Sequence, residues 1–396
     1  MKNYKNDFPF FENVSDIYFD SAATSQKPKA VLDKLKEYYT SYCANTHRGS
    51  HDLGNRATRE YEEARETTRE FINAQQTEEI VFTKGTTEAI NLIASSFVSQ
   101  RFKTLILSRL EHHSNIVPWQ LNGFKEGENL FIIPMNDDLS INLKAYKELL
   151  KEHPNSFVSV THVSNAFGII NPVRELTYLA HKYDSTILVD GAQAIAHIDV
   201  DVKELNVDFY VFSAHKMFGP TGVGVLYGKY ELLNQTKPYQ GGGTMIDDVS
   251  FEKTTYLNPP HRFEAGTQNI AGVIGFKEAI KYINDIGYNE IVRHDMQLIR
   301  YANSELKKID SLRLFTDSDN ICGNISFNID GIHHNDIGVL LDKQHITLRT
   351  GHHCALPAMK YLGVDGSVRV SFTIYNTIEE IDIFIKALIR AIGMLK

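Results

Sequence analysis

Two short stretches of the chain carry side chains suited to covalent chemistry. The stretch RTGHHCALP, residues 349–357, places Cys354 directly after two histidines. A second stretch, DFYVFSAHKMFGP at residues 208–220, brings Lys216 to the end of an apolar run. A cysteine thiolate is a nucleophile and a metal ligand. A lysine desolvated at the end of a buried strand has a lowered pKa, which allows its amine to form a Schiff base near neutral pH.

The thiol of Cys354 has several interpretations. Neighbouring side chains such as His352, His353 and Cys354 rarely converge on one ion, and no CxxC or HxxxH pattern stands out, so we predict no metal site. A disulfide is disfavoured, because three widely spaced cysteines are typical of a reducing cytosol. An inert buried cysteine and a reactive nucleophile both remain open.

The alternative for Lys216 is an ordinary surface lysine just past the end of a strand, and other residues must favour a cofactor site before a Schiff base is inferred. Asp190 ends the apolar run TILVD, and a carboxylate there could pair with the protonated ring nitrogen of a pyridine cofactor. Gln193 follows three residues later and could reach a ring oxygen. The alternative for Asp190 is capping of the next helical segment.

A phosphate group would need a cradle, and residues 85–88 (GTTE) offer one. A glycine allows a close turn, while the hydroxyls of Thr86 and Thr87 and the free N–H groups of a helix start favour an anion. His113, in the run EHHSN, could stack on a flat aromatic ring. An ordinary helix cap and an ordinary loop histidine are the alternatives.

Alternating apolar runs and helical segments indicate the elements that position these side chains. Apolar runs bounded by turns predict strands at 79–83, 103–108, 157–161, 186–190, 209–212 and 224–227. Helical patterns lie between some of them, at 86–98 and 173–183. This order predicts a mostly parallel α/β sheet covered on both faces. Ligands bind such sheets outside the carboxyl ends of the strands, where Asp190 lies.

The C-terminal part predicts a smaller α+β unit. Its expected strands lie at 312–316, 324–329 and 368–372, and its last helix begins with a capping box at Thr377. We therefore expect two domains. The large α/β domain covers residues 18–280, and the small α+β domain combines residues 1–17 and 281–396.

Composition limits the classes of partner. The chain has 396 residues and a formal net charge of −8, which argues against nucleic acid or an anionic membrane as the main partner. No apolar run approaches the roughly 20 residues that span a bilayer. The first 19 residues show neither a signal-peptide core nor an Arg/Ser-rich transit pattern. We expect a cytoplasmic protein.

Nine motifs together resemble one known family. They are YFDSAATSQKP (18–28), NTHRGSH (45–51), FTKGTTEAIN (82–91), LEHHSNIVPW (110–119), THVSN (161–165), LVDGAQ (188–193), YVFSAHKMFGPTGVGVLY (210–227), RFEAGT (262–267) and RTGHHCA (349–355). The pattern is similar to the class V aminotransferase family of fold type I pyridoxal-phosphate enzymes. The last motif resembles the group II, SufS-like cysteine desulfurases. The resemblance implies a large, mostly parallel seven-stranded sheet domain and a smaller α+β C-terminal domain.

The resemblance also implies roles for the cofactor site. Lys216 would hold pyridoxal 5'-phosphate covalently and act as general base at the substrate Cα. Asp190 would hold the ring nitrogen protonated, Gln193 would reach the ring oxygen, and His113 would stack on the ring and serve catalysis. The expected cofactor-phosphate ligands are Thr86, Thr87, Ser213 and His215, with Gly266 and Thr267 supplied by the second protomer of a homodimer.

Substrate roles follow from the same resemblance. Asn165 and Arg349 match the expected carboxylate anchors, and the planar fork of an arginine suits that task. Arg369 is a lesser candidate, and a surface ion pair is the alternative for Arg349. Cys354 would attack the sulfur of bound L-cysteine, giving an enzyme persulfide and alanine.

We therefore expect a cysteine desulfurase that passes sulfur to an acceptor protein of iron–sulfur cluster assembly. A selenocysteine lyase or cysteine-sulfinate desulfinase is the nearest alternative, since those reactions can proceed without an enzyme persulfide. An ordinary aminotransferase would need an amino-group acceptor. A non-catalytic metal-binding or scaffold module would not need Lys216 and Asp190.

Overall fold

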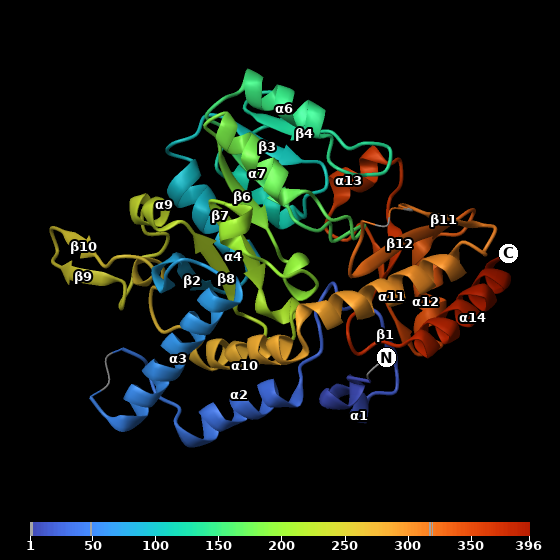
Figure 1. The fold of residues 1–396 in the computed structure, drawn as a ribbon, viewed down its shortest axis with the longest axis horizontal. Helices are drawn as coiled ribbons and strands as arrows, with labels where there is room; N and C mark the ends of the chain where they lie inside the picture. The colour runs from blue at the N-terminus through green and yellow to red at the C-terminus, as the bar shows by residue number, and fades with distance from the viewer. Residues whose placement is uncertain (1–2, 48–49, 317, 319) are drawn as a thin grey trace.

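The computed structural model describes residues 3–47, 50–316, 318 and 320–396. Arg48 and Gly49 of the NTHRGSH motif therefore lie outside the described residues, as do the first two residues of the expected small domain. A large sheet flanked by helices occupies the centre of the molecule, and a smaller sheet with its own helices lies beside it (Figure 1). This is the α/β arrangement that the sequence predicts.

The large sheet has seven strands in the order β2-β8-β7-β6-β5-β3-β4. Their bounds are β2 (Ile80–Thr83), β3 (Leu105–Ser108), β4 (Leu130–Ile133), β5 (Phe157–Thr161), β6 (Thr186–Asp190), β7 (Phe209–Ser213) and β8 (Gly224–Gly228). Only β8 runs antiparallel to its neighbours. The apolar runs indicated six of these strands but not β4, a short edge strand whose middle residues are only partly buried.

Both faces of the large sheet are buried, which explains why its strands read as continuous apolar runs. In β6, Ile187 and Val189 join one apolar cluster, whereas Leu188 joins the cluster on the opposite face. The same alternation occurs in β3, where Ile106 faces the first cluster and Leu107 the second. Side chains of a strand alternate between faces, so one strand serves two cores.

Helices cover both faces of this sheet. The α-helices of the described chain, including those beside the smaller sheet, are α1 (Phe10–Asn13), α2 (Lys29–Ser41), α3 (Asp52–Phe71), α4 (Thr86–Ile93), α5 (Val117–Leu121), α6 (Leu143–Glu152), α7 (Val173–Lys182), α8 (Val202–Leu205), α9 (Tyr230–Gln235), α10 (Ile270–Ile286), α11 (Tyr288–Leu306), α12 (His334–Asp342), α13 (Leu356–Tyr361) and α14 (Ile378–Leu395). Helix α10 packs against α2 and α3, while α4 packs against β7 and β8 (Figure 1). None of the helices in the described part of the chain is both long and apolar enough to cross a membrane.

The smaller sheet has the order β11-β12-β15-β14. Its strands are β11 (Leu312–Leu314), β12 (Asn324–Ile329), β14 (Arg349–Gly351) and β15 (Ser367–Ser371). Strand β14 was not predicted, because RTG carries no apolar pattern. Its antiparallel register places Arg349 directly opposite Arg369. The predicted capping box is confirmed, since the Thr377 side chain accepts from the N–H of Glu380.

Two further pairings complete the fold. Strand β1 (Ile17–Tyr18) pairs with β13 (Ile346–Thr347), which ties the N-terminal arm to the C-terminal segment. Strands β9 (Ile246–Val249) and β10 (Thr254–Tyr256) form a hairpin that projects from the large sheet (Figure 1). The exact domain boundaries at residues 17 and 280 remain a prediction.

A buried ion pair joins α3 to the segment that carries the RFEAGT motif. Glu264 accepts from Arg65 Nη1 at 2.7 Å and Nη2 at 2.9 Å, and also from the backbone N–H of Phe82 at 2.8 Å. Arg65 and Glu264 are both almost fully buried. Removing one partner of such a pair leaves an uncompensated charge in the core.

We expect Glu264→Ala to destabilise the protein by about 3 kcal/mol, the lower end of the cost of breaking a buried pair, because Glu62 still accepts from Arg65 Nε while Nη1 and Nη2 lose their carboxylate. Urea denaturation of the intact protein measures the shift in midpoint. The control is Asp33→Ala, which removes an exposed pair with Lys29 and should change the midpoint little. Equal shifts for the two variants would contradict a structural role for the buried pair.

Candidate active site

Loops at the carboxyl edge of the large sheet and the start of the small sheet enclose a cavity of about 330 Å³. The candidate residues that line it are Thr86, Thr87, Asn165, Asp190, Gln193, Ser213, His215, Lys216, Arg349, Cys354 and Arg369. Three candidates are not among its lining residues, namely His113, Gly266 and Thr267. Side chains separated by more than 200 residues in the chain thus meet in one place.

The parallel register of the large sheet explains why these side chains lie in one cavity. Thr161 at the end of β5 pairs with Asp190 at the end of β6, and Asp190 pairs with Val211 in β7. Strand β7 then ends at Ser213 and leads into a 3₁₀ turn, η6 (Ala214–Lys216), that carries Lys216. Parallel strands that end at one edge deliver their following residues to the same crevice.

Burial dominates the electrostatics of the cavity. Asp190 is almost fully buried, and its Oδ1 accepts from the backbone N–H of Ala192 at 3.0 Å. Desolvation raises the pKa of Asp190, while the nearby Lys216 opposes that shift. Desolvation also lowers the pKa of Lys216 to about 8, against the attraction of Asp190. A cationic ring nitrogen beside Asp190 would offset the cost of burying that carboxylate.

The candidate phosphate cradle is a set of hydroxyl and amide donors around the start of α4. The Thr86 N–H donates to Ser213 Oγ at 2.9 Å, and the two hydroxyl oxygens lie 2.8 Å apart. Thr87 Oγ1 lies 2.8 Å from Ser114 Oγ. Burial lowers the pKa of His215 to about 4, so its neutral ring presents one N–H donor.

A close backbone approach shapes this cradle. Strand β8 passes the start of α4 so closely that a Cβ on Gly224 would lie 2.4 Å from the Cα of Gly85. Glycine is therefore required at residue 224.

Gly266 and Thr267 line a separate surface pocket, together with Gln240, rather than the cavity of Lys216.

The two histidines of LEHHSN have different surroundings. His112 lines the cavity, and burial together with the charge of Lys216 lowers its pKa to about 3. His113 instead faces the loop of Cys354, where its ring lies 5.4 Å from that of His352. The geometry therefore favours His112, rather than the expected His113, as the ring against a flat cofactor. Two adjacent histidines cannot be told apart by type, so the sequence carried no signal for this choice.

Glu111 is a further residue that the sequence did not single out. Its carboxyl group is buried, accepts from the Thr161 N–H at 3.0 Å and from Asn115 Nδ2 at 2.6 Å, and is bonded to Ser108 Oγ. Burial raises the pKa of Glu111 to about 8. These bonds tie the segment that carries His112 to the ends of β3 and β5.

The two arginines of the cavity differ in their freedom to bind an anion. Arg349 is half-exposed, and its fork is already paired with Asp20, from Nε at 3.0 Å and Nη2 at 2.7 Å. Arg369 is buried and donates from Nη1 to the Asn165 carbonyl at 2.8 Å. Among the described residues its buried Nε finds no hydrogen-bond partner. A buried guanidinium that lines a cavity suits a carboxylate ligand.

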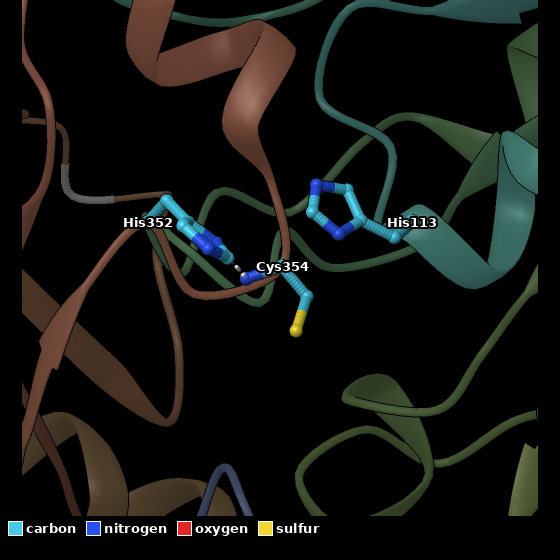
Figure 2. A group of neighbouring side chains, drawn as sticks. All are labelled: His113, His352 and Cys354. Atoms are coloured by element: carbon cyan, nitrogen blue, oxygen red, sulfur yellow. Dashed lines mark hydrogen bonds between the residues drawn. The ribbon is translucent and has the colours of Figure 1, made fainter.

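The loop of Cys354 has an unusual backbone. Both His353 and Cys354 adopt left-handed φ values, of 51° and 55°. Asn165 Nδ2 donates to the His353 carbonyl at 2.6 Å, and the Cys354 N–H donates to His352 Nδ1 at 3.0 Å. Figure 2 shows Cys354 flanked by His113 and His352, with its sulfur pointing away from both rings.

The side chains of His113, His352 and Cys354 lie close enough to hold a metal ion, since their potential ligand atoms are within 4.8 Å of one another. Their hydrogen bonds argue against it. His352 Nδ1 accepts from Cys354, and His113 Nε2 accepts from the Leu356 N–H at 3.1 Å. A neutral imidazole has one acceptor nitrogen, so the other carries a proton. Metal binding would have to break these bonds, and we retain the prediction of no metal here.

The cavity fits pyridoxal 5'-phosphate by the chemistry of its donors. A buried carboxylate, Asp190, suits a protonated pyridine nitrogen, the donors around Thr86 suit a phosphate, and Lys216 offers an amine with a lowered pKa. The fold and this donor set define a fold type I pyridoxal-phosphate enzyme.

Comparison with known proteins identifies the family. The model of the family described as "Aminotransferase class-V" matches residues 17–384, and the chain belongs to that family. The chain is 45% identical over 393 residues to a cysteine desulfurase of Synechococcus elongatus, covering 98% of this chain and 63% of the relative. It is 44% identical to a probable cysteine desulfurase of Halalkalibacterium halodurans, covering 94% of this chain and 92% of the relative.

Solved structures show the same fold. The cysteine desulfurase CsdA of Escherichia coli, in an S-sulfonic acid form, superposes with a TM-score of 0.92 at 36% identity, covering 99% of this chain and 98% of its own. The apo cysteine desulfurase of Thermococcus onnurineus NA1 gives 0.93 at 38% identity, covering 100% and 99%. The chain spans less than two thirds of some curated relatives, 63% of the Synechococcus protein and 57% of one from Mycolicibacterium paratuberculosis.

We expect the attachment of pyridoxal phosphate to depend on Lys216 and on pH. The free amine fraction of Lys216 rises as pH passes through about 8, its lowered pKa, so covalent attachment to the apo protein should quicken from pH 7 to 9 and then level off. Stopped-flow absorbance measures the rate. Lys216→Ala should leave no borohydride-reducible link, and a link formed equally well in that variant would exclude Lys216.

Proposed function

We propose that this protein is a cysteine desulfurase that converts L-cysteine to L-alanine and carries the sulfur as a persulfide on Cys354. The observation that carries the proposal is the presence of Cys354, Lys216 and Arg369 in the wall of one cavity. This set offers a nucleophilic thiol, an amine with a lowered pKa and a cation for the substrate carboxylate. The similar proteins named cysteine desulfurase support the same activity.

The substrate carboxylate is proposed to bind Arg369. Its side chain lines the cavity, and so does that of Asn165. Burial lowers the pKa of Arg369 to about 10, which still leaves it cationic at neutral pH. Arg349, the stronger candidate from sequence, would first have to release Asp20. We therefore assign Arg349 to orienting Asp20 and the neighbouring strand end.

Bound pyridoxal phosphate would withdraw electrons from the substrate Cα through its protonated ring. Asp190 keeps that ring nitrogen protonated, and the amine of Lys216 accepts and returns the proton at Cα. The Cys354 thiolate forms an S–S bond with the substrate sulfur as the substrate C–S bond breaks. The electron pair of the C–S bond stays with the substrate, and Cβ takes up a proton to become the methyl group of alanine. The balance is L-cysteine plus the Cys354 thiol giving L-alanine plus the Cys354 persulfide.

The persulfide then needs a second reaction. Cys354 is exposed, so an acceptor thiol can reach its outer sulfur. We propose that the acceptor is a protein of iron–sulfur cluster assembly and that the enzyme is of the group II, SufS-like kind, because RTGHHCA resembles the motif of that group. A reducing cytoplasm would keep all three cysteines as thiols.

A homodimer is also part of the proposal. Gly266 and Thr267 lie outside the cavity of their own chain, in a separate surface pocket. A second protomer could bring these residues to the cofactor phosphate of its partner.

Cys354→Ala tests the persulfide mechanism. With L-cysteine and a reductant, the intact holoenzyme should release alanine, and the variant should lose at least about a hundredfold of that rate because it lacks the nucleophile. Cys43→Ala, which removes an exposed cysteine that does not line the cavity, is the matched control. Equal alanine release by Cys354→Ala would favour the selenocysteine lyase or cysteine-sulfinate desulfinase alternative.

Two conservative variants separate the arginines. Arg369→Lys keeps the charge but loses the planar fork, so the KM for L-cysteine should rise about tenfold to a hundredfold. Arg349→Lys should raise it less, because Asp20 already occupies that fork. Steady-state alanine release gives both values, and a larger effect at Arg349 would restore it as the carboxylate anchor.

A further inference from the structure

His113 lies outside the cavity but contacts the Cys354 loop through two hydrogen bonds. Its backbone N–H donates to the Cys354 carbonyl at 2.7 Å. Its ring Nε2 accepts from the backbone N–H of Leu356 at 3.1 Å. His113, the first residue of η4 (His113–Asn115), therefore binds the backbone on both sides of Ala355.

The loop needs such contacts. Consecutive left-handed φ values at His353 and Cys354, neither a glycine, persist only where surrounding structure enforces them. His353 is held by Asn165 and by Ser367, whose Oγ lies 2.8 Å from His353 Nε2. For Cys354, Ala355 and Leu356, the hydrogen bonds that the described residues make outside the loop and α13 are those with His113.

The support behind His113 is rigid. Asn115, in the same turn, is fully buried and bonded on several sides. Its Oδ1 accepts from Ser159 Oγ at 2.6 Å and from Trp119 Nε1 at 3.0 Å, and its Nδ2 donates to Glu111. Ser159 lies in β5, so the turn is anchored on the large sheet. His113 thus couples the Cys354 loop, which follows β14, to the large sheet.

We propose that His113 is a positioning residue that holds the Cys354 loop, and with it the thiol, in its left-handed conformation. The inference rests on the proposed function and deepens it, because a thiol must be aligned with the substrate sulfur to attack it. It differs from the role expected from sequence, in which His113 stacks on the cofactor. The ring must be neutral at Nε2 to accept from Leu356. Burial and the neighbouring His352 lower the pKa of His113, which favours that neutral form.

Two variants of the holoenzyme test the proposal. Glutamine can present an acceptor oxygen where His113 presents Nε2, whereas alanine cannot. His113→Ala should lower alanine release from L-cysteine about tenfold, the factor expected for one lost hydrogen bond. His113→Gln should recover most of that loss. The absorbance and content of bound pyridoxal phosphate should match those of the intact protein in both variants.

Hydrogen–deuterium exchange measures the protection of the backbone amides in the Cys354 loop independently of enzyme turnover. In His113→Ala, amides of the peptide covering residues 352–358 should exchange at least about tenfold faster than in the intact protein, and His113→Gln should restore their protection. Unchanged exchange in the alanine variant would overturn the proposal. The proposal would also be overturned if His113→Gln were as slow as His113→Ala. Loss of cofactor absorbance in either variant would contradict it as well, because that would assign His113 to the cofactor. If the intact protein released no alanine, the proposed function would fail. Hydrogen–deuterium exchange would still test whether His113 holds the Cys354 loop.

Discussion

Burial of charged groups at one edge of a parallel sheet is the constraint on which this structure depends. Strands β5, β6 and β7 run in register, so the residues that follow them open into the same crevice. Asp190 and Lys216 are desolvated there. Desolvation raises the pKa of Asp190 and lowers the pKa of Lys216, so it favours the neutral form of each. Buried groups of this kind are costly unless a ligand completes their interactions. The site therefore suits a cofactor that carries a cationic ring nitrogen, beside Asp190, and a phosphate group, beside the donors around Thr86.

The small sheet supplies the other half of the site, and its register decides how. Strand β14 runs beside β15, which puts Arg349 and Arg369 opposite each other. Asp20, from the N-terminal arm, contacts both guanidinium groups. One carboxylate shared by two arginines leaves net positive charge in the wall, and the buried arginine keeps an unsatisfied donor. That charge would attract the anionic substrate that we propose.

Much of the fold could be predicted from the residues. Continuous apolar runs indicated six of the seven central strands, and the capping box at Thr377 predicted the start of α14. The strands β4 and β14 were missed for opposite reasons. Edge strand β4 does carry a short apolar run, LFII, that was not among the predicted strands, whereas the RTG of β14 has no apolar pattern. Local pattern reports apolar side chains, so a strand such as β14 that carries none escapes it.

The sequence by itself determined the chemistry of the site, because residue types dictate which groups can be nucleophile, amine, carboxylate or phosphate ligand. Tertiary structure alone decided which member of a similar pair lies where. His112 lines the cavity while His113 grips the Cys354 loop, and Arg369 keeps an unsatisfied donor while Arg349 is paired with Asp20. Neighbouring residues of one type differ only in direction, and direction is set by backbone register and packing far away in the chain.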